Sequence, residues 1–341
     1  MNNIRKNHVS AGIYYHETNK TTKYQKQSFT SSFIGGGSNS HIKPSSKPQG
    51  GGGGGSVPPT PPVPQETRIV AKFYVENTSS PTAISFNNGW YDGASNYSSI
   101  EIDGIVQSRV TTSYTFDSRG EHVVKYTLKN PSFIARAAFD GCVCLENVFI
   151  PSSIESIGGS AFTSCYNLSS VTFGDDSMLN VIGERAFENC RTIANIDIPD
   201  NVVTIEKDAF YHCSGLTTCT IGSGITNING YAFAGCGSLS SVTFSDISHL
   251  DNIGLMCFAA CGGLTTIKIP ESITSIGQQA FNSCNHLASI SIYALAPPTL
   301  GIIPFNDTNE CPIYVPNDSV EAYKSAERWS EYSDRIQPIQ Q

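Results

Sequence analysis

The chain has 341 residues, of which 39% are hydrophobic and 15% are charged, and its net charge at pH 7 is −8. This length allows more than one domain, and the lack of any run of about 18 apolar residues argues against a membrane-spanning helix. Residues 1–64 hold seven Lys and Arg against one acid, a net charge of +6, so residues 65–341 carry −14 and are not expected to bind nucleic acid.

Residues 1–49 are polar and aperiodic, a composition typical of a disordered tail. No apolar segment follows the first charged residues, so we expect no Sec signal peptide. The basic tail is interpreted either as a solvated segment or as an anchor that docks the protein on a virion or a cell surface. Residues 50–65 are interpreted as a linker, in which six glycines are flexible and a proline-rich stretch is a stiff spacer.

Residues 66–130 predict a small all-β domain. Strand candidates cover 68–75, 82–86, 99–103, 113–116 and 121–128, and a four-residue loop closed by Gly120 joins the last two as a hairpin. We expect this domain to cap the first repeat, because an uncovered end would expose a sheet edge and the core. Carbohydrate binding through Trp90 and Tyr91 is an alternative use of the same domain.

Residues 131–296 contain seven copies of a motif in which a phenylalanine is followed three residues later by a cysteine. Successive phenylalanines are 23, 25, 23, 23, 25 and 23 residues apart, and such a spacing predicts a solenoid of stacked leucine-rich-type units. The two longer spacings come from two extra residues after a strand, which we assign to surface loops at 174–179 and 245–250. The seven pairs are Phe139/Cys142, Phe162/Cys165, Phe187/Cys190, Phe210/Cys213, Phe233/Cys236, Phe258/Cys261 and Phe281/Cys284.

The second copy, residues 157–173, shows what each unit encodes. Its first five apolar residues recur at offsets of 0, 4, 5, 8 and 11, which is the spacing of one face of a helix. Val171 and Phe173 then alternate as in a strand with one buried side. Each unit is therefore predicted to be a short strand, a turn and a short helix or helical turn, and stacked units give an α/β solenoid with a narrow parallel sheet.

The chain has eleven cysteines, and seven of them occupy the same position of the repeat. Neighbouring strands of a sheet lie about 4.8 Å apart, so these thiols are expected to form a column. Because free cysteine packs as a small hydrophobic residue, we favour a ladder of reduced, buried thiols over disulfides or a metal site. The absence of a Cys-x-x-Cys motif argues against a zinc knuckle or a redox site.

Residues 297–341 are predicted to cap the far end of the solenoid. Pro297 and Pro298 interrupt the repeat pattern, and residues 313–315 form one more short strand. A last helix, capped by Asp318 or Ser319, is expected to run to residue 328. Aromatic and aliphatic side chains at the end of the chain are expected to close the core, namely Trp329, Tyr332 and Ile336.

The repeat, written Ile-x-x-Ile-Gly-x-x-Ala-Phe-x-x-Cys-x-x-Leu-x-x-Val-x-Ile-Pro, resembles the BspA-type leucine-rich repeat. The match is best at residues 154–173 and 273–292. The resemblance implies a solenoid fold and a surface-exposed adhesion or recognition protein of bacteria, with relatives in some protists and in gut phages. The C-terminal stretch also resembles the ending of such proteins in gut Bacteroidetes and their phages.

The sequence contains no recognisable catalytic, cofactor or metal motif. His16-Glu17 lacks the second histidine of a zinc-protease helix, and Gly222-Ser223-Gly224 is not a nucleophile elbow. The loop acids Asp175, Asp176 and Asp246 lack the alternating oxygen ligands of a calcium loop. We therefore expect a protein that is not an enzyme and that carries no cofactor.

The outward side of the predicted strands remains as the candidate binding face. If Val171 and Phe173 point inward, Ser170 and Thr172 point outward, and the same parity holds in every copy. Small polar groups of this kind either solubilise a strand stack or form a flat recognition surface. The first outward row is Asn147, Ser170, Asn195, Thr218, Ser241, Thr266 and Ser289. The second is Phe149, Thr172, Asp197, Thr220, Thr243, Lys268 and Ser291.

These patterns favour a non-enzymatic recognition or adhesion module that presents its repeats to a protein or glycan on a cell surface. Two alternatives stay open. One is a display protein of a phage virion or tail, and the other is an architectural solenoid without a specific ligand. The expected location is extracellular, on a cell surface or on a virion.

Overall fold

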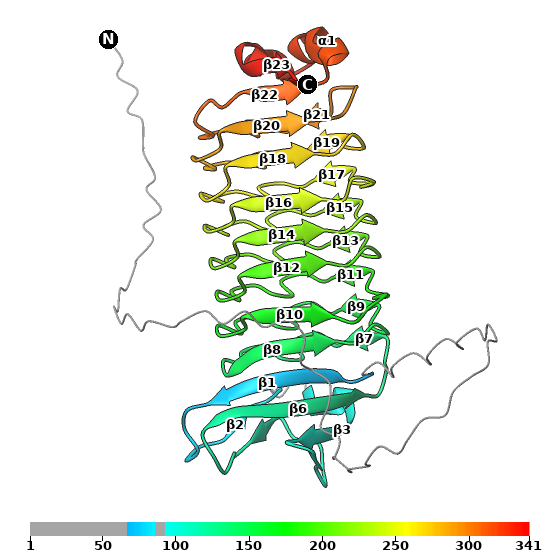
Figure 1. Ribbon diagram of the computed structural model, residues 1–341, viewed down its shortest axis with the longest axis vertical. Helices are drawn as coiled ribbons and strands as arrows, with labels where there is room; N and C mark the ends of the chain where they lie inside the picture. The colour runs from blue at the N-terminus through cyan, green and yellow to red at the C-terminus, as the bar shows by residue number, and fades with distance from the viewer. Residues whose placement is uncertain (1–66, 86–92, 341) are drawn as a thin grey trace, which may run out of the picture. The chain divides into compact units, whose positions relative to one another are not determined.

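The computed structural model describes residues 67–85 and 93–340, which are coloured in Figure 1. The predictions for the tail 1–49, the linker 50–65 and the pair Trp90 and Tyr91 lie outside the described residues. The chain divides into two units, Met1–Pro61 and Pro62–Gln341, and every described residue belongs to the second. None of the helices in this described part is long and apolar enough to cross a membrane.

The repeats form a solenoid in which each turn contributes one strand to each of two columns (Figure 1). Strands within a column are parallel and in register, as predicted. The first column holds β8 (Leu145–Ile150), β10 (Ser170–Phe173), β12 (Asn195–Ile198), β14 (Thr218–Ile221), β16 (Ser241–Phe244), β18 (Thr266–Ile269), β20 (Ser289–Ile292) and β22 (Ile313–Val315). The second holds β7 (Phe133–Ile134), β9 (Ser156–Ile157), β11 (Val181–Ile182), β13 (Thr204–Ile205), β15 (Asn227–Ile228), β17 (Asn252–Ile253), β19 (Ser275–Ile276) and β21 (Thr299–Leu300).

The predicted solenoid is confirmed, but it is a β-solenoid, and turns occupy the place of the short helix or helical turn that was predicted in each repeat. In the second repeat, Ser160 and Ser164 have φ of 57° and 58°, and left-handed residues interrupt a right-handed helix. Alternate amides of this segment bond to the next repeat, as from Phe162 N to Ala186 O at 2.7 Å, while those between bond three residues back. Apolar residues spaced three and four positions apart therefore occur here in a stack of turns and not on one face of a helix. The one α-helix of the described residues is α1 (Val320–Ser325).

A column of stacked phenylalanine rings lies at the centre of the solenoid. Rings of successive repeats from Phe139 to Phe281 have centroids 5.0–5.5 Å apart and planes within 2–7° of parallel, and every ring is fully buried. This confirms the predicted aromatic core. An eighth ring, Phe305, which the repeat motif did not predict, stacks 5.9 Å from Phe281. Tyr126 contacts the first ring and Trp329 contacts the eighth.

The predicted column of reduced thiols is confirmed and has a hydrogen-bonding role. All eleven cysteines, each within the described residues, are free. From the second repeat onward, each motif thiol donates to the carbonyl oxygen of the phenylalanine one repeat earlier, as from Cys213 Sγ to Phe187 O at 3.1 Å. Burial raises the pKa of these thiols, to about 12 at Cys213 and Cys284. The column therefore stays protonated and links each turn to the one before it.

Before the first repeat lies an antiparallel β-unit. Its strands are β1 (Ile69–Val75), β3 (Tyr97–Ile102), β4 (Ile105–Val106) and β6 (Gly120–Leu128), with the pair β2 (Thr82–Ala83) and β5 (Ser113–Tyr114) and the 3-10 turn η1 (Gly93–Asn96). One sheet runs in the order β10-β8-β1-β6-β3-β4, because β1 pairs with both β6 and β8. The pairing of β1 with β8 provides a physical basis for the cap, which stays a prediction.

The C-terminal segment follows the eighth turn. It contains η2 (Asn317–Ser319), α1, η3 (Trp329–Arg335) and β23 (Ile336–Pro338), which pairs with β22. The buried Tyr323 hydroxyl donates to Ala294 O at 2.8 Å, and the Trp329 indole donates to Pro298 O at 2.7 Å. The helix ends earlier than the predicted residue 328, since Ala326 is already extended.

We predict that Phe210→Ala lowers the free energy of unfolding by about 3–5 kcal/mol, because it removes a buried ring and leaves a cavity between two stacked neighbours. Urea unfolding followed by circular dichroism measures the change. The matched control is Met178→Ala in an exposed loop, which should shift stability by less than about 0.5 kcal/mol. Equal effects of the two substitutions would contradict a central role for the ring column.

The buried thiols predict instability at alkaline pH. Unfolded thiols ionise with a pKa of about 8.5, whereas the folded column holds its protons to higher pH, so the unfolded state binds fewer protons above that value. Stability is therefore fully present below about pH 8.5 and falls by about 1.4 kcal/mol per pH unit for each buried thiol as pH rises. Urea unfolding from pH 7.5 to 10 measures the slope.

The control for this slope is Cys213→Ser, which keeps a donor for Phe187 O but removes one titrating thiol. The free energy of unfolding of this variant should fall less steeply with pH, with a slope smaller by about 1.4 kcal/mol per pH unit, because one thiol fewer ionises on unfolding. A slope identical to that of the wild-type chain, or rapid reaction of the native thiols with a disulfide reagent at pH 8, would contradict this account.

Candidate functional site

The fourteen residues predicted to face outward all lie on the first column, on strands β8, β10, β12, β14, β16, β18 and β20. Nine are exposed, while Asn147, Phe149, Ser170, Ser289 and Ser291 are half-buried. The inward residues between them, such as Ile196 and Ile267, are at most 2% exposed. The structure thus has the parity that the sequence predicts, although ligand binding by this face stays a prediction.

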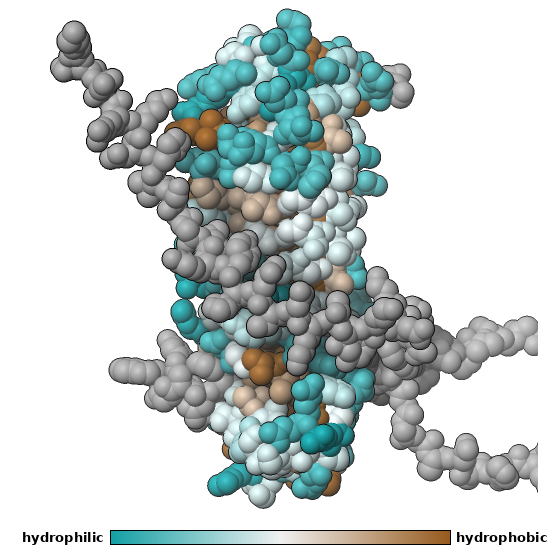
Figure 2. All heavy atoms as spheres, turned by 90° about the vertical axis from the view of Figure 1, so that its left-hand side faces the viewer, coloured by the Kyte–Doolittle hydropathy of each residue, from teal (hydrophilic) through white to brown (hydrophobic). Residues whose placement is uncertain are grey.

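In-register pairing aligns the outward side chains in rows. Thr218 lies between Asn195 and Ser241 along one row, and Thr220 lies between Asp197 and Thr243 along the other. The Thr218 hydroxyl donates to Asn195 Oδ1, so some outward groups bond to each other across strands. The uncovered part of the solenoid flank that faces the viewer in Figure 2 is mostly white and teal, with tan and brown residues in places.

The first column is interrupted at two steps, whereas the second is continuous from β7 to β21. Strand pairing stops between β10 and β12 and again between β16 and β18. At paired steps the residue after each strand donates its N–H to the previous strand, as Gly222 does to Ile198 O at 3.0 Å. Pro199 and Pro270 occupy this position after β12 and β18, and proline has no N–H to donate. A proline therefore removes one bond of the ladder at both interrupted steps, although β22, which Pro316 follows, still pairs with β20.

Two further features mark both interruptions. The strand before each break ends in phenylalanine, Phe173 or Phe244. The other repeats have a buried isoleucine at this position, such as Ile221. Both rings are half-buried against the core and so reach the surface. The two extra residues that lengthen these repeats follow directly. The loops predicted from the 25-residue spacings are thus the places where the strand column opens.

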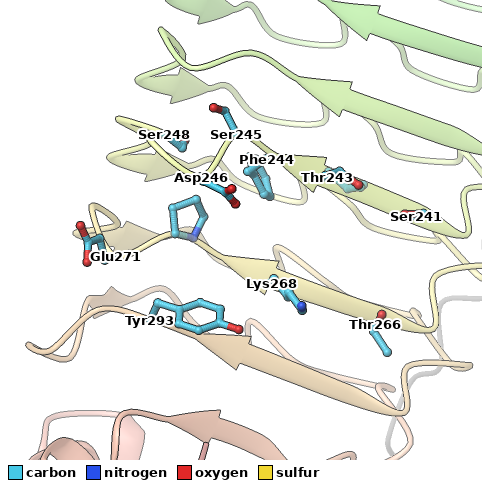
Figure 3. A pocket seen from close by; sticks show the side chains of 12 residues that line it. Ser241, Thr243, Phe244, Ser245, Asp246, Ser248, Thr266, Lys268, Glu271 and Tyr293 are labelled. Carbon is cyan, nitrogen blue, oxygen red and sulfur yellow. The ribbon is translucent and has the colours of Figure 1, made fainter. Parts of the chain in front are cut away.

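The opening between β16 and β18 forms a groove of about 600 Å³. Figure 3 shows Phe244 of β16 above it, Lys268 of β18 at its centre, and Tyr293, which follows β20, at its lower side. Asp246 and Glu271 lie toward one end, and the hydroxyls of the outward strand residues line the other. Two of the predicted face residues from each side of the break therefore meet here, Ser241 and Thr243 from β16 and Thr266 and Lys268 from β18.

The groove carries both signs of charge. Lys268 is the single cation among the fourteen outward residues, and the ion pairs within the described residues do not include it. Asp246 and Glu271 likewise pair with no cation in that part of the chain, and both are exposed. Unpaired charges at the surface are available to a ligand of matching charge.

Phe244, Glu271 and Tyr293 line the groove, although the repeat pattern did not predict them as parts of a site. Tyr293 is 39% exposed and directly follows β20. It lies two residues after Ser291, the last outward residue predicted on that strand. A signal was present in the sequence, since the phenylalanine at a strand end, the longer spacing and the following proline coincide at both breaks. No group of three or more metal-ligating side chains occurs within residues 67–85 and 93–340.

The comparison with protein families identifies the repeat. A family model described as a BspA type Leucine rich repeat region (6 copies) matches residues 132–252 and 203–309. Together these matches cover 132–309, just over half of the 341 residues. The chain belongs to the BspA-type leucine-rich repeat family. The resemblance that the Ile-Gly, Ala-Phe and Cys positions of the BspA-type repeat indicated is thereby confirmed.

Solved structures with similar folds include a leucine-rich repeat protein from Bacteroides ovatus, with 23% identity, a TM-score of 0.42, and coverage of 59% of this chain and 61% of that one. A T. pallidum leucine-rich repeat protein gives 24% identity, a TM-score of 0.39, and coverage of 53% and 71%. The Pneumococcal vaccine antigen PcpA gives 16% identity, a TM-score of 0.32, and coverage of 61% of this chain and 69% of that one. No curated protein matches significantly. The BspA-type assignment rests on the family model.

We predict that outward and inward residues of one strand differ sharply in their effect on stability. Thr220→Ala should change the free energy of unfolding by less than about 0.5 kcal/mol, because Thr220 is exposed. Ile221→Ala, one residue further along β14 and fully buried, should cost about 2–5 kcal/mol. Thermal and urea unfolding of both variants measure this, and a large loss for Thr220→Ala would mean that the outward face is structural.

Proposed function

We propose that this BspA-type protein is a non-enzymatic recognition module whose outward strand face binds a protein or a glycan on a cell surface. One observation carries the proposal, namely the in-register rows of exposed small side chains on strands β10 to β20. Solenoids bind along such extended faces because the repeats hold many groups at fixed intervals. The stacked rings and hydrogen-bonded thiols beneath them favour a rigid surface.

The small size of the outward side chains favours a broad, shallow contact. Serine and threonine hydroxyls both donate and accept hydrogen bonds, so the rows can bind the polar groups of a protein or a saccharide. An enzyme would need a constellation of perturbed acids, bases or nucleophiles in a pocket. The thiols with raised pKa are instead buried in the core and away from this face.

The setting that we propose is a cell surface, in keeping with the surface-exposed proteins that the family resemblance implies. A phage virion or tail is the alternative setting, with residues 1–49 as its anchor. An architectural solenoid without a ligand is the alternative in function. An architectural solenoid needs only the stable ring column. Ligand binding through the outward face therefore distinguishes the proposed function from this alternative.

We predict that charge placed on the face weakens binding of the full chain to bacterial or host cells by at least about tenfold, which corresponds to ~1.4 kcal/mol. The variant carries Thr218→Glu, Thr220→Glu and Thr243→Glu, whose side chains are exposed on β14 and β16. Flow cytometry with labelled protein over a concentration series measures binding.

The matched control places three glutamates on the second column, at Thr204, Asn252 and Ser275. These substitutions add the same charge, and binding should change by less than about twofold, since repulsion between charges in water falls off within about 10 Å. Equal losses for both variants would point to a general charge effect, and absence of cell binding by the wild-type chain would favour the architectural alternative.

A further inference from the structure

The groove between β16 and β18 differs from the rest of the outward face in its side chains. Most of the face is built from small hydroxyl and amide groups, whereas the groove adds the rings of Phe244 and Tyr293 to the ammonium group of Lys268. Figure 3 shows the Tyr293 ring lying beside the β18 chain with its hydroxyl directed toward the side of Lys268. A shallow face thus has one place with both aromatic surface and an unpaired cation.

Strand register fixes the relation between these groups. Lys268 on β18 lies opposite Ser291 on β20, and Tyr293 follows two residues later, so it lies on the same side of the column. Residues displaced by two positions across neighbouring strands are within reach of aromatic and long side chains. Tyr293 and Lys268 can therefore contact one small ligand at the same time.

The chemistry of the lining fits a sugar. A pyranose ring has C–H groups on its faces and hydroxyls around its edge, so it packs on an exposed aromatic ring while its edge takes hydrogen bonds. Tyr293 supplies an amphipathic ring, Thr243 and Thr266 supply hydroxyls, and the carboxylates of Asp246 and Glu271 accept hydrogen bonds from sugar hydroxyls.

The geometry points to the groove between β16 and β18 as a subsite for a saccharide that bears a carboxylate, stacked on Tyr293 with its carboxylate bound by Lys268. A carboxylate is the group that an unpaired ammonium binds with a charge-assisted hydrogen bond, and a neutral sugar would leave Lys268 without a partner. This inference rests on the proposed function and deepens it, since it assigns a ligand class to one part of the recognition face.

An extended peptide fits the groove less well. Peptides that add a strand to a sheet need an edge open to solvent along its length, but here the edges of β16 and β18 face each other. Behind them β15 and β17 remain paired in register, which limits how far the two turns can separate. Peptide anchors also need deep apolar pockets, whereas serine, threonine and charged residues supply most of this lining.

The second break provides a matched control within the same chain. Residues 170–179 (SVTFGDDSML) and 241–250 (SVTFSDISHL) are 71 residues apart and share the phenylalanine and the longer loop. At the equivalent positions, however, Asp197 replaces Lys268 and Gly222 replaces Tyr293. The β10–β12 break therefore has the backbone features of the groove without the cation or the second ring.

The test is isothermal titration of the full chain with two oligosaccharides of equal length, one ending in glucuronate and one in glucose, and with an acidic peptide. We expect the glucuronate-ended probe to bind at least about tenfold more tightly than the glucose-ended one, an energy difference of ~1.4 kcal/mol. Lys268→Gln should remove this preference. Tyr293→Ala should weaken the affinity for both oligosaccharides about tenfold or more, whereas Tyr293→Phe should retain binding. Asp197→Asn, which also removes one charge at the equivalent position, should leave both affinities within about twofold.

The inference is overturned if neither oligosaccharide binds, or if Lys268→Gln and Tyr293→Ala bind both as the wild-type chain does. Binding of the acidic peptide with both saccharides silent would overturn it in favour of a peptide site. If cells bind the wild-type chain and the Lys268→Gln/Tyr293→Ala variant equally, the groove assignment fails and the proposed function stands. If the saccharide binds but cells do not, the groove assignment stands and the proposed function fails.

Discussion

The column of stacked phenylalanine rings is the constraint on which the rest of the solenoid depends. Rings 5.0–5.5 Å apart require a distance per turn close to the 4.7–4.9 Å separation of paired strands, so the core and the strand ladders stabilise the same stacking. The thiol of each repeat adds a bond to the preceding phenylalanine carbonyl, as from Cys236 to Phe210 O. Because the core fixes the turn-to-turn distance, the outward side chains fall into rows without any contact among themselves being necessary.

The same core explains why the strand column can open locally. At the break between β16 and β18, the rings of Phe233 and Phe258 still stack at 5.4 Å, and Cys261 still donates to Phe233 O. The second column also continues across this step, from β15 to β17. The break therefore forgoes only a few strand hydrogen bonds, each with a net value of about 0.5–1.5 kcal/mol, while the buried contacts remain. The groove therefore forms without disturbing the centre of the fold.

The sequence predicted the features that repeat in every copy, and its errors concern features that depend on neighbouring copies or on backbone conformation. The rings, the thiols and the outward parity follow from spacing alone. The helix was wrong because the left-handed positions are held by ordinary residues such as Ser160, Arg185 and His212, which give no signal of positive φ. Phe305 was missed because Pro304 and Thr308 replace the alanine and cysteine of the motif. The groove was missed because it lies between two repeats and depends on which strands fail to pair.

The recurrence of the break after 71 residues shows that its backbone features and its outward side chains vary independently. Both breaks keep the strand-end phenylalanine, the longer loop and the following proline, which are the features that set the backbone. The residues that differ, Asp197 against Lys268 and Gly222 against Tyr293, point outward or follow the strand and leave the core unchanged. The breaks are three turns apart, about 15 Å at the spacing of a sheet, so the face has two unlike breaks in strand pairing, one with acidic residues and one with residues of both charges. Under the proposed function, we therefore expect a change of one or two outward residues to alter what is bound at a break, while the ring column keeps its position.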